Sequence, residues 1–150
     1  MKVIWIGLFF VAILAIGSFT AFGSSLTGAA ISGGSGYTSL SLSDITSTAK
    51  WYKYDSGGTE IRFFAVKASD GSIKTGFDAC DVCYGSHKGY RQEGDYMVCN
   101  NCGNKYPING LGTENKNPGG CWPGFLPNTV SGDNLLIKNA DIEGGKWRFA

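Results

Sequence analysis

The sequence predicts a mainly β protein: a small β-rich domain with two Cys-x-x-Cys metal-binding turns and little helix, after an N-terminal transmembrane or signal helix. Short runs rich in aromatic and β-branched residues, separated by glycine-containing turns, are typical of β-strands. No segment beyond residue 43 repeats its apolar residues at the spacing of a long amphipathic helix. Two cysteine pairs lie between such runs, at Cys80-x-x-Cys83 and Cys99-x-x-Cys102.

Residues 1–23 are predicted to be a signal anchor or a signal peptide. The run from Val3 to Phe22 holds no charge and no proline, and its length suits a helix that spans a bilayer. Lys2 would stay on the cytoplasmic side, so the rest of the chain would face outward. Ala21 and Gly23 are small residues with the spacing of a cleavage site. The length of the run favours an uncleaved anchor, which places the chain on the extracytoplasmic face of the membrane; a cleaved signal makes it a secreted protein.

Residues 24–43 form a Gly/Ser/Thr-rich segment without a charged residue. Such a composition buries too little apolar surface to offset its chain entropy, so we expect a flexible tether. Residues 44–150 remain as one exported, Cys-rich, metal-binding domain. The chain of 150 residues has a formal net charge of +1. Because phosphate binding needs a basic surface, nucleic acid is not expected as a partner.

Within the domain we expect a hairpin of residues 50–55 and 60–67, since Ser56, Gly57 and Gly58 stand between the two runs. Further short strands are expected at 73–79, 96–98, 106–108, 134–138 and 146–149. Short turns of helix are expected after Ser43 and after Asn139, because both residue types cap helices. The segment 109–127 is rich in glycine and proline and should be mostly loop.

The four paired cysteines have the spacing expected of a four-thiolate metal site. Two thiolates three residues apart on a tight turn take two corners of a tetrahedron, and a second turn on a hairpin supplies the other two. Glycine follows each pair, at Gly85 and Gly103, and permits a left-handed backbone that closes the turn and points N–H groups at sulfur. The pattern favours metal or cluster ligation by Cys80, Cys83, Cys99 and Cys102.

Other interpretations of these thiols stay open. Exported chains often carry disulfides, although an odd number of five cysteines argues against a simple disulfide framework. A thioredoxin-like dithiol lacks its expected βαβ surroundings. Iron, an iron–sulfur cluster and zinc all accept thiolate ligands, and spacing alone does not separate them.

The fifth cysteine, Cys121, follows Gly119-Gly120 and precedes Trp122-Pro123. The glycines allow a close approach of the backbone and the proline stiffens the exit, so we expect Cys121 at or near the metal site. It is a candidate extra ligand, replacement ligand or resolving thiol, and a buried structural cysteine is the alternative.

Several neighbouring residues are weaker candidates. His87, the single histidine, lies between the pairs and is expected to be exposed rather than to bind metal. Met97 fits an ordinary strand residue better than a copper ligand. The basic residues Lys88, Arg91 and Lys105 either offset the negative charge of a thiolate site or belong to a solvated loop. Four carboxylates flank the site and are either groups that support the ligands from behind or, as the default interpretation, surface charges: Asp78, Asp81, Glu93 and Asp95.

Four phrases carry a family resemblance: IRFFAVKASDGSI, FDACDVCY, KGYRQEGDYMVCNNCG and GGCWP, in that order across about half of the chain. The run from Trp51 to Pro127 resembles the FtrD-like family of membrane iron–sulfur-containing proteins. The resemblance implies an exported, membrane-linked domain associated with iron or electron handling, sometimes near metal-transport systems. It implies these metal or cluster ligands: Cys80, Cys83, Cys99, Cys102 and Cys121. The same motifs include Phe77, Asp78, Gly89, Tyr90 and Met97.

No hydrolytic motif and no phosphate-binding loop is present, and a single histidine argues against a Ser–His or Cys–His catalytic pair. The sequence therefore predicts a membrane-tethered, extracytoplasmic metal or iron–sulfur binding protein. It would transfer electrons or iron to a membrane redox or metal-transport partner, as a carrier rather than a turnover enzyme. The alternatives are a structural zinc-ribbon binding module and a dithiol oxidoreductase that uses Cys121.

Overall fold

The computed structural model describes residues 29–31, 36–117 and 119–150. The anchor or signal peptide predicted at residues 1–23 lies outside these described residues. As predicted, the domain is β-rich: its strands form three small sheets, and one short α-helix is present among the described residues.

The first sheet has the order β1 (Ala29–Ile31), β3 (Lys50–Ser56), β4 (Thr59–Lys67) and β5 (Ile73–Phe77). β1 runs parallel to β3, and the other neighbours are antiparallel. β3 and β4 form the predicted hairpin, whose turn places Gly57 and Gly58 at φ values of 60° and 91°. Side chains other than glycine avoid positive φ, so this pair of glycines allows the tight turn.

The strand β4 contributes side chains to two separate cores. Ile61, Phe63 and Ala65 belong to the first core, whereas Phe64 and Val66 belong to the second, and all five are fully buried. Successive residues of a strand point to opposite faces, so one continuous apolar run serves both packing regions. The two Cys-x-x-Cys turns lie at the second core, which includes Cys80 and Cys99.

A second sheet, of β2 (Tyr37–Ser41), β10 (Asn134–Lys138) and β9 (Thr129–Ser131), closes the first core. It corrects the tether predicted at residues 24–43, because the chain from Tyr37 onward is part of the fold. Thr38 and Leu40 are buried while their neighbours in β2 are exposed. This alternation makes a half-buried strand that pairs with β10 in spite of its serine-rich composition.

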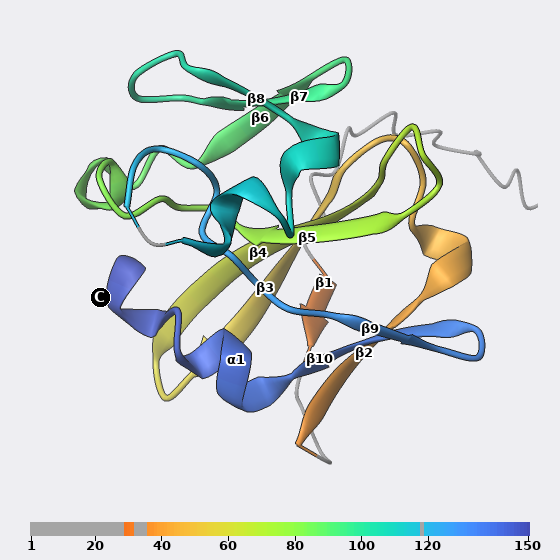
Figure 1. The fold of residues 1–150 in the computed structure, drawn as a ribbon. Helices are drawn as coiled ribbons and strands as arrows, with labels where there is room; N and C mark the ends of the chain where they lie inside the picture. Colours follow the sequence, from red (N-terminus) through yellow and green to blue (C-terminus); the bar gives the residue numbers. More distant parts are fainter. Residues whose placement is uncertain (1–28, 32–35, 118) are drawn as a thin grey trace, which may run out of the picture.

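The third sheet has the order β6 (Tyr90–Glu93), β7 (Tyr96–Cys99) and β8 (Lys105–Pro107) and covers the second core. Met97 and Val98 are fully buried, so Met97 is an ordinary strand residue, as expected. Figure 1 shows this sheet at one end of the molecule, β3 to β5 in the middle, and the sheet of β2, β10 and β9 toward the other end.

The C-terminal segment contains α1 (Asn139–Glu143) and a 3-10 turn, η5 (Lys146–Arg148). The strand predicted at residues 146–149 is therefore wrong. A Cβ atom on Gly145 would lie 2.2 Å from the ring of Phe77, so the chain packs against β5 through its glycine. The N–H groups of Arg148 and Phe149 donate to carbonyls three residues earlier, at 3.1 and 2.9 Å, so these donors are used within the turn and not in a strand ladder.

The two predicted turns of helix are present near their expected positions, as η1 (Leu42–Asp44) and α1. Neither is capped by a side-chain hydrogen bond, so the capping argument for Ser43 and Asn139 is wrong in its mechanism. Instead, the carboxamide oxygen of Asn139 accepts a hydrogen bond from Thr38 Oγ1 at 2.9 Å and ties α1 to β2.

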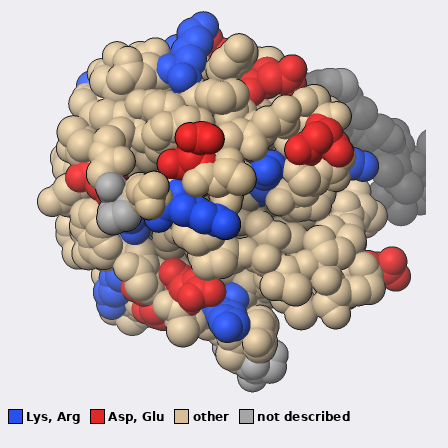
Figure 2. Space-filling view, viewed as in Figure 1, with Lys and Arg blue, Asp and Glu red and all other residues tan. Residues whose placement is uncertain are grey.

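Among the residues that the structure describes, no helix has both the length and the apolar composition needed to cross a bilayer. Figure 2 shows acidic and basic side chains interspersed on the viewed face, without a large area of one sign. This mixed surface agrees with the near-zero net charge of the chain.

Candidate metal centre

The five thiols come from three loops that the fold brings together. Cys80 and Cys83 follow β5, Cys99 and Cys102 lie at the end of β7 and in the turn to β8, and Cys121 is part of the long loop before β9. Their sulfur atoms form two overlapping groups, of Cys80, Cys83 and Cys121 and of Cys83, Cys99 and Cys102. Within each group all sulfur atoms lie within 4.8 Å of one another. Cys83 belongs to both groups.

The first cysteine turn directs a backbone donor at sulfur, as expected of a metal-binding turn. The N–H of Cys83 donates to Cys80 Sγ at 2.9 Å, and the turn continues into a 3-10 turn, η2 (Tyr84–Ser86). The left-handed residue that ends it is His87, at φ 53°, rather than the predicted Gly85. The 3-10 turn continues past Gly85 to Ser86, so the left-handed backbone conformation is adopted by His87, two residues later than predicted.

The second cysteine turn uses its glycine as predicted. Gly103 has a φ of 76°, and its N–H donates to the Cys99 carbonyl at 2.9 Å. Burial raises the pKa of the Cys99 thiol, and backbone hydrogen bonding from Cys102 and Asn101 opposes that shift. Both turns therefore provide N–H groups that stabilise a thiolate on the first cysteine of the pair.

The long loop delivers the fifth thiol to the other four. The sulfur atoms of Cys121 and Cys83 are 3.5 Å apart, and the Tyr90 hydroxyl donates to the Cys121 carbonyl at 2.5 Å. Gly119 and Gly120 have φ values of 104° and 86°, and no atom crowds either one. These glycines are therefore needed for their backbone conformation and not for close approach, which corrects the predicted reason.

The buried carboxylate of Asp78 joins the segments that carry the two cysteine pairs. Its Oδ1 accepts hydrogen bonds from the Tyr90 N–H at 2.8 Å and from Trp51 Nε1 at 3.2 Å. Arg62 Nε lies 3.6 Å from Oδ2. A Cβ atom on Gly89 would come within 2.4 Å of the same oxygen, so only glycine fits there. Burial raises the pKa of Asp78, and the two N–H donors oppose that shift.

A second carboxylate, Asp81, ties the first turn to the long loop and to the C-terminal segment. Arg148 donates to Asp81 Oδ1 from Nη2 at 2.7 Å and from Nε at 3.0 Å, and both side chains are largely buried. The N–H of Gly119 donates to Asp81 Oδ2 at 2.7 Å. The Arg148 guanidinium also lies 5.1 Å from the ring of Phe77. One carboxylate thus fixes the loop that carries Cys121.

The thiols differ in their tendency to ionise. Hydrogen bonding from the Asn101 side chain, and then contact with Cys121, lowers the pKa of Cys83 to about 7. Burial raises the pKa of Cys99 to about 11 and raises the pKa of Cys121 above its ordinary value. Without a metal, Cys83 is therefore the thiol of these three that ionises most readily.

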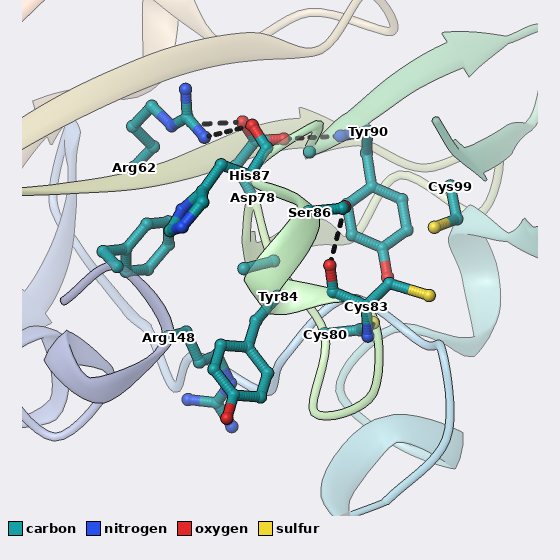
Figure 3. A pocket seen from close by; sticks show the side chains of 13 residues that line it. Arg62, Asp78, Cys80, Cys83, Tyr84, Ser86, His87, Tyr90, Cys99 and Arg148 are labelled. Carbon is teal, nitrogen blue, oxygen red and sulfur yellow. Dashed lines mark hydrogen bonds and ion pairs between the residues drawn. The ribbon is translucent and has the colours of Figure 1, made fainter. Parts of the chain in front are cut away.

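The thiols are enclosed by protein on most sides. Cys80 and Cys99 are 2% exposed, Cys83 and Cys121 are partly buried, and Cys102 is exposed at the surface. Figure 3 shows Cys83 and Cys99 beside a small cavity that Arg62, Asp78, Tyr90 and Arg148 help to line. The cavity measures about 10 Å³, which is the room of one water molecule. It offers no space for an organic substrate.

The donor set fits a metal ion or an iron–sulfur cluster. All five donors are sulfur, the ligand type shared by structural zinc, iron and iron–sulfur clusters. Four thiolate ligands are enough for a zinc ion, an iron ion or an iron–sulfur cluster, so one of the five cysteines is not needed as a ligand. In a tetrahedral zinc site the sulfur atoms lie roughly 3.8 Å apart, given metal–sulfur bonds of about 2.3 Å. The spacing within each group is compatible with this.

The remaining predicted residues lie outside the thiol groups. His87 belongs to neither group and is exposed; its carbonyl accepts a hydrogen bond from Arg62. Arg91 and Lys105 both pair with Glu93 on the surface, as in the solvated-loop interpretation. The Lys88 carbonyl accepts a hydrogen bond from Asn100.

Sequence reasoning missed three residues that hold the site. Surface charge, the default interpretation of Asp78 and Asp81, is wrong, and the alternative supporting role is the one the structure shows. Arg148 lies in a 3-10 turn and not in the predicted strand. For Asp78 a signal was present: the residue stands directly after the buried strand β5, between Phe77 and Cys80. For Arg148 no local signal exists, because its partner lies 67 residues away.

Comparison with known proteins bears out the resemblance seen in the sequence. Residues 45–149 match the model of the family described as membrane iron-sulfur containing protein FtrD-like. The match covers most of the chain and includes all five cysteines. No significant match is found among the curated proteins.

Proposed function

Because the chain belongs to the FtrD-like family of membrane iron–sulfur-containing proteins, we propose that it is an extracytoplasmic, membrane-tethered iron or iron–sulfur protein. It passes electrons or iron to a membrane redox or metal-transport partner. The observation that carries the proposal is the gathering of five thiols from three loops into two groups that share Cys83. A bound cluster or iron ion supplies a one-electron redox couple at this place.

The protein's own residues prepare the site for such a centre. Cys80 and Cys99 are buried and accept backbone N–H groups, which stabilise negative charge on sulfur. Hydrogen bonds to the sulfur atoms and limited solvent access are the means by which a protein sets a reduction potential. Cys102 is exposed at the edge of the site, so an electron would have a short path between a bound centre and the protein surface.

The test is the metal content of the full chain purified without oxygen. We expect iron, with or without acid-labile sulfide, together with thiolate-to-iron absorption that is lost in Cys83→Ser. His87→Ala is the matched control, since this side chain belongs to neither thiol group, and it should keep the iron and the spectrum. Stoichiometric zinc without a redox signal would support the zinc-ribbon module instead. Colourless, metal-free protein with disulfides would contradict both.

A dithiol oxidoreductase is a second candidate function, and one observation favours it. Cys83 has a pKa of about 7 and its sulfur lies 3.5 Å from that of Cys121. The Cys83 thiolate would attack a substrate disulfide and release one thiol. Cys121 would then displace the second substrate thiol and form the Cys83–Cys121 disulfide. A defined reduction potential in metal-free protein, abolished by Cys121→Ser, would establish this activity.

A further inference from the structure

The two thiol groups contain three sulfur atoms each and have one sulfur in common. The first group is Cys80, Cys83 and Cys121, and the second is Cys83, Cys99 and Cys102. Within each group, every pair of sulfur atoms lies within 4.8 Å. All five cysteines are in the described part of the chain, and no four of their sulfur atoms meet this limit together. A single ion with four thiolate ligands would therefore have to take them from both groups.

The spacing of the sulfur atoms suits two ions better than one. A tetrahedral ion holds its four sulfur atoms roughly 3.8 Å from one another, given metal–sulfur bonds of about 2.3 Å. The spacing within each group is compatible with this value, and the sulfur atoms of Cys83 and Cys121 are 3.5 Å apart. In any choice of four sulfur atoms, at least one pair that joins the two groups is longer than 4.8 Å. One ion would need the groups to move together, whereas one ion in each group needs no such movement.

The composition of the groups gives the fifth cysteine a role that a four-thiolate site does not. Each group consists of one Cys-x-x-Cys pair and one further sulfur. Cys121 completes the group of the first pair, and Cys83 completes the group of the second pair while it belongs to its own. Each group also has one buried cysteine, Cys80 in the first and Cys99 in the second. Three thiolates for each of two ions require five cysteines when one sulfur is shared.

The charges around the thiols also favour two ions. Five thiolates leave a net charge of about −3 with one divalent ion and about −1 with two. Arg62 and Arg148 line the cavity beside the thiols, but they pair with Asp78 and Asp81, so their positive charges are already offset. Because uncompensated charge at a largely buried site is costly, a second ion stabilises the full set of thiolates.

We propose that the site binds two metal ions bridged by the thiolate of Cys83. The first group holds one ion and the second group holds the other. With metal–sulfur bonds of about 2.3 Å, a shared sulfur limits the separation of the ions to about 4.6 Å. This limit admits the separation of about 3.5–4 Å that is found in two-metal sites of proteins.

Three protein sulfur atoms leave a fourth position on each four-coordinate ion for a ligand from outside. An open position is typical of reactive metal centres, whereas purely structural sites are closed by four protein ligands. The inference rests on the proposed iron-handling function and adds the number of ions and the thiols that hold each one.

The experiment is a titration of the full chain, reduced, metal-free and without oxygen, with Co²⁺ as the spectroscopic probe for a divalent ion. Thiolate-to-cobalt absorption should rise until about two ions are bound per chain, and elemental analysis after gel filtration should give the same number. Because a bridging sulfur couples the spins of the two ions, the electron paramagnetic resonance signal per cobalt should be weaker than that of isolated cobalt.

Three cysteine variants separate the two positions. Cys121→Ser and Cys102→Ser each remove a sulfur from one group only, so each should bind about one ion per chain with an undiminished resonance signal. Cys83→Ser removes the shared sulfur and should abolish the spin coupling. Val82→Ser is the matched control, since Val82 lies within the first cysteine turn, is 62% exposed and offers no ligand atom. This control should bind as many ions as the unmodified chain.

One cobalt ion per chain in the unmodified protein, or two ions without spin coupling, would overturn the bridged pair. Acid-labile sulfide in the chain purified without oxygen would also overturn it, because the iron is then joined by sulfide and not by Cys83. In each case a redox-active iron signal in the purified chain leaves the proposed function standing. Two coupled cobalt ions in a chain that is purified without iron and without a redox signal would support the pair and overturn the proposed function.

Discussion

Replacement of Asp78 tests how the two cysteine turns are held together. In Asp78→Ala, the Tyr90 N–H loses its acceptor in a buried place, and Trp51 Nε1 loses the same acceptor in a partly buried one. An unsatisfied buried donor costs about 1–3 kcal/mol. With Trp51 at the lower end of that range, the expected loss of folding free energy is about 2–4 kcal/mol.

Asp78→Asn is the matched variant because both N–H groups donate to the same oxygen, Oδ1. The carboxamide oxygen of asparagine can accept both hydrogen bonds. Only the pairing of Oδ2 with Arg62 is lost, and Arg62 is about one-third exposed. Partly exposed ion pairs contribute roughly 1 kcal/mol or less. We therefore expect Asp78→Asn to cost no more than about 1 kcal/mol.

The assay is urea unfolding of the full chain at a fixed, buffered zinc concentration, because bound metal adds to apparent stability by mass action. Zinc affinity, from competition with a chelator, is the second measurement. Asp78→Ala should lower both the midpoint and the affinity, since Asp78 links the segments that carry the two turns. Equal effects of the alanine and asparagine variants would refute the reasoning, because they would mean that charge, and not hydrogen bonding, holds the turns.

Three further predictions follow from the same geometry. Gly89→Ala should lower the urea midpoint much more than Gly94→Ala, because both glycines have positive φ but only the first would place a Cβ atom against a buried carboxylate; equal losses would mean that backbone strain alone matters. Arg148→Met should cost about 3–5 kcal/mol of folding free energy by leaving a largely buried carboxylate unpaired, whereas Lys53→Met, at an exposed ion pair, should cost about 1 kcal/mol or less. In reduced, metal-free protein, the rate of Cys83 alkylation should rise with pH to half its maximum near 7, because the thiolate is the nucleophile; a midpoint at the ordinary thiol pKa would show that the hydrogen bonds to its sulfur are absent.

Local signals in the sequence were enough for the β3–β4 hairpin and the second cysteine turn. The β3–β4 hairpin is specified by two apolar runs and a Gly-Gly turn, all within eighteen residues of chain. Gly103 closes the second cysteine turn as predicted from its position directly after Cys102. Each of these features depends on residues that are neighbours in sequence, so pattern and turn chemistry predict them.

The features that sequence reasoning missed depend on distant residues. β2 is a strand because β10, almost a hundred residues later, offers it a pairing edge. Arg148 lies in a turn because Asp81 and Phe77 hold its guanidinium in place. Tertiary contacts of this kind override local composition and propensity, and they cannot be predicted from patterns in a single sequence.

The place of Cys121 far along the chain has a consequence for the unfolded protein. A metal that binds both Cys80 and Cys121 closes a loop of about forty residues. By analogy with a covalent cross-link, the lost chain entropy raises the free energy of the unfolded chain by about 4 kcal/mol at 25 °C. The second pair lies inside that loop and divides it further. A chain that takes up its metal early would begin folding as a set of short closed segments, and β6, β7 and β8 would form within a ring that is already drawn together.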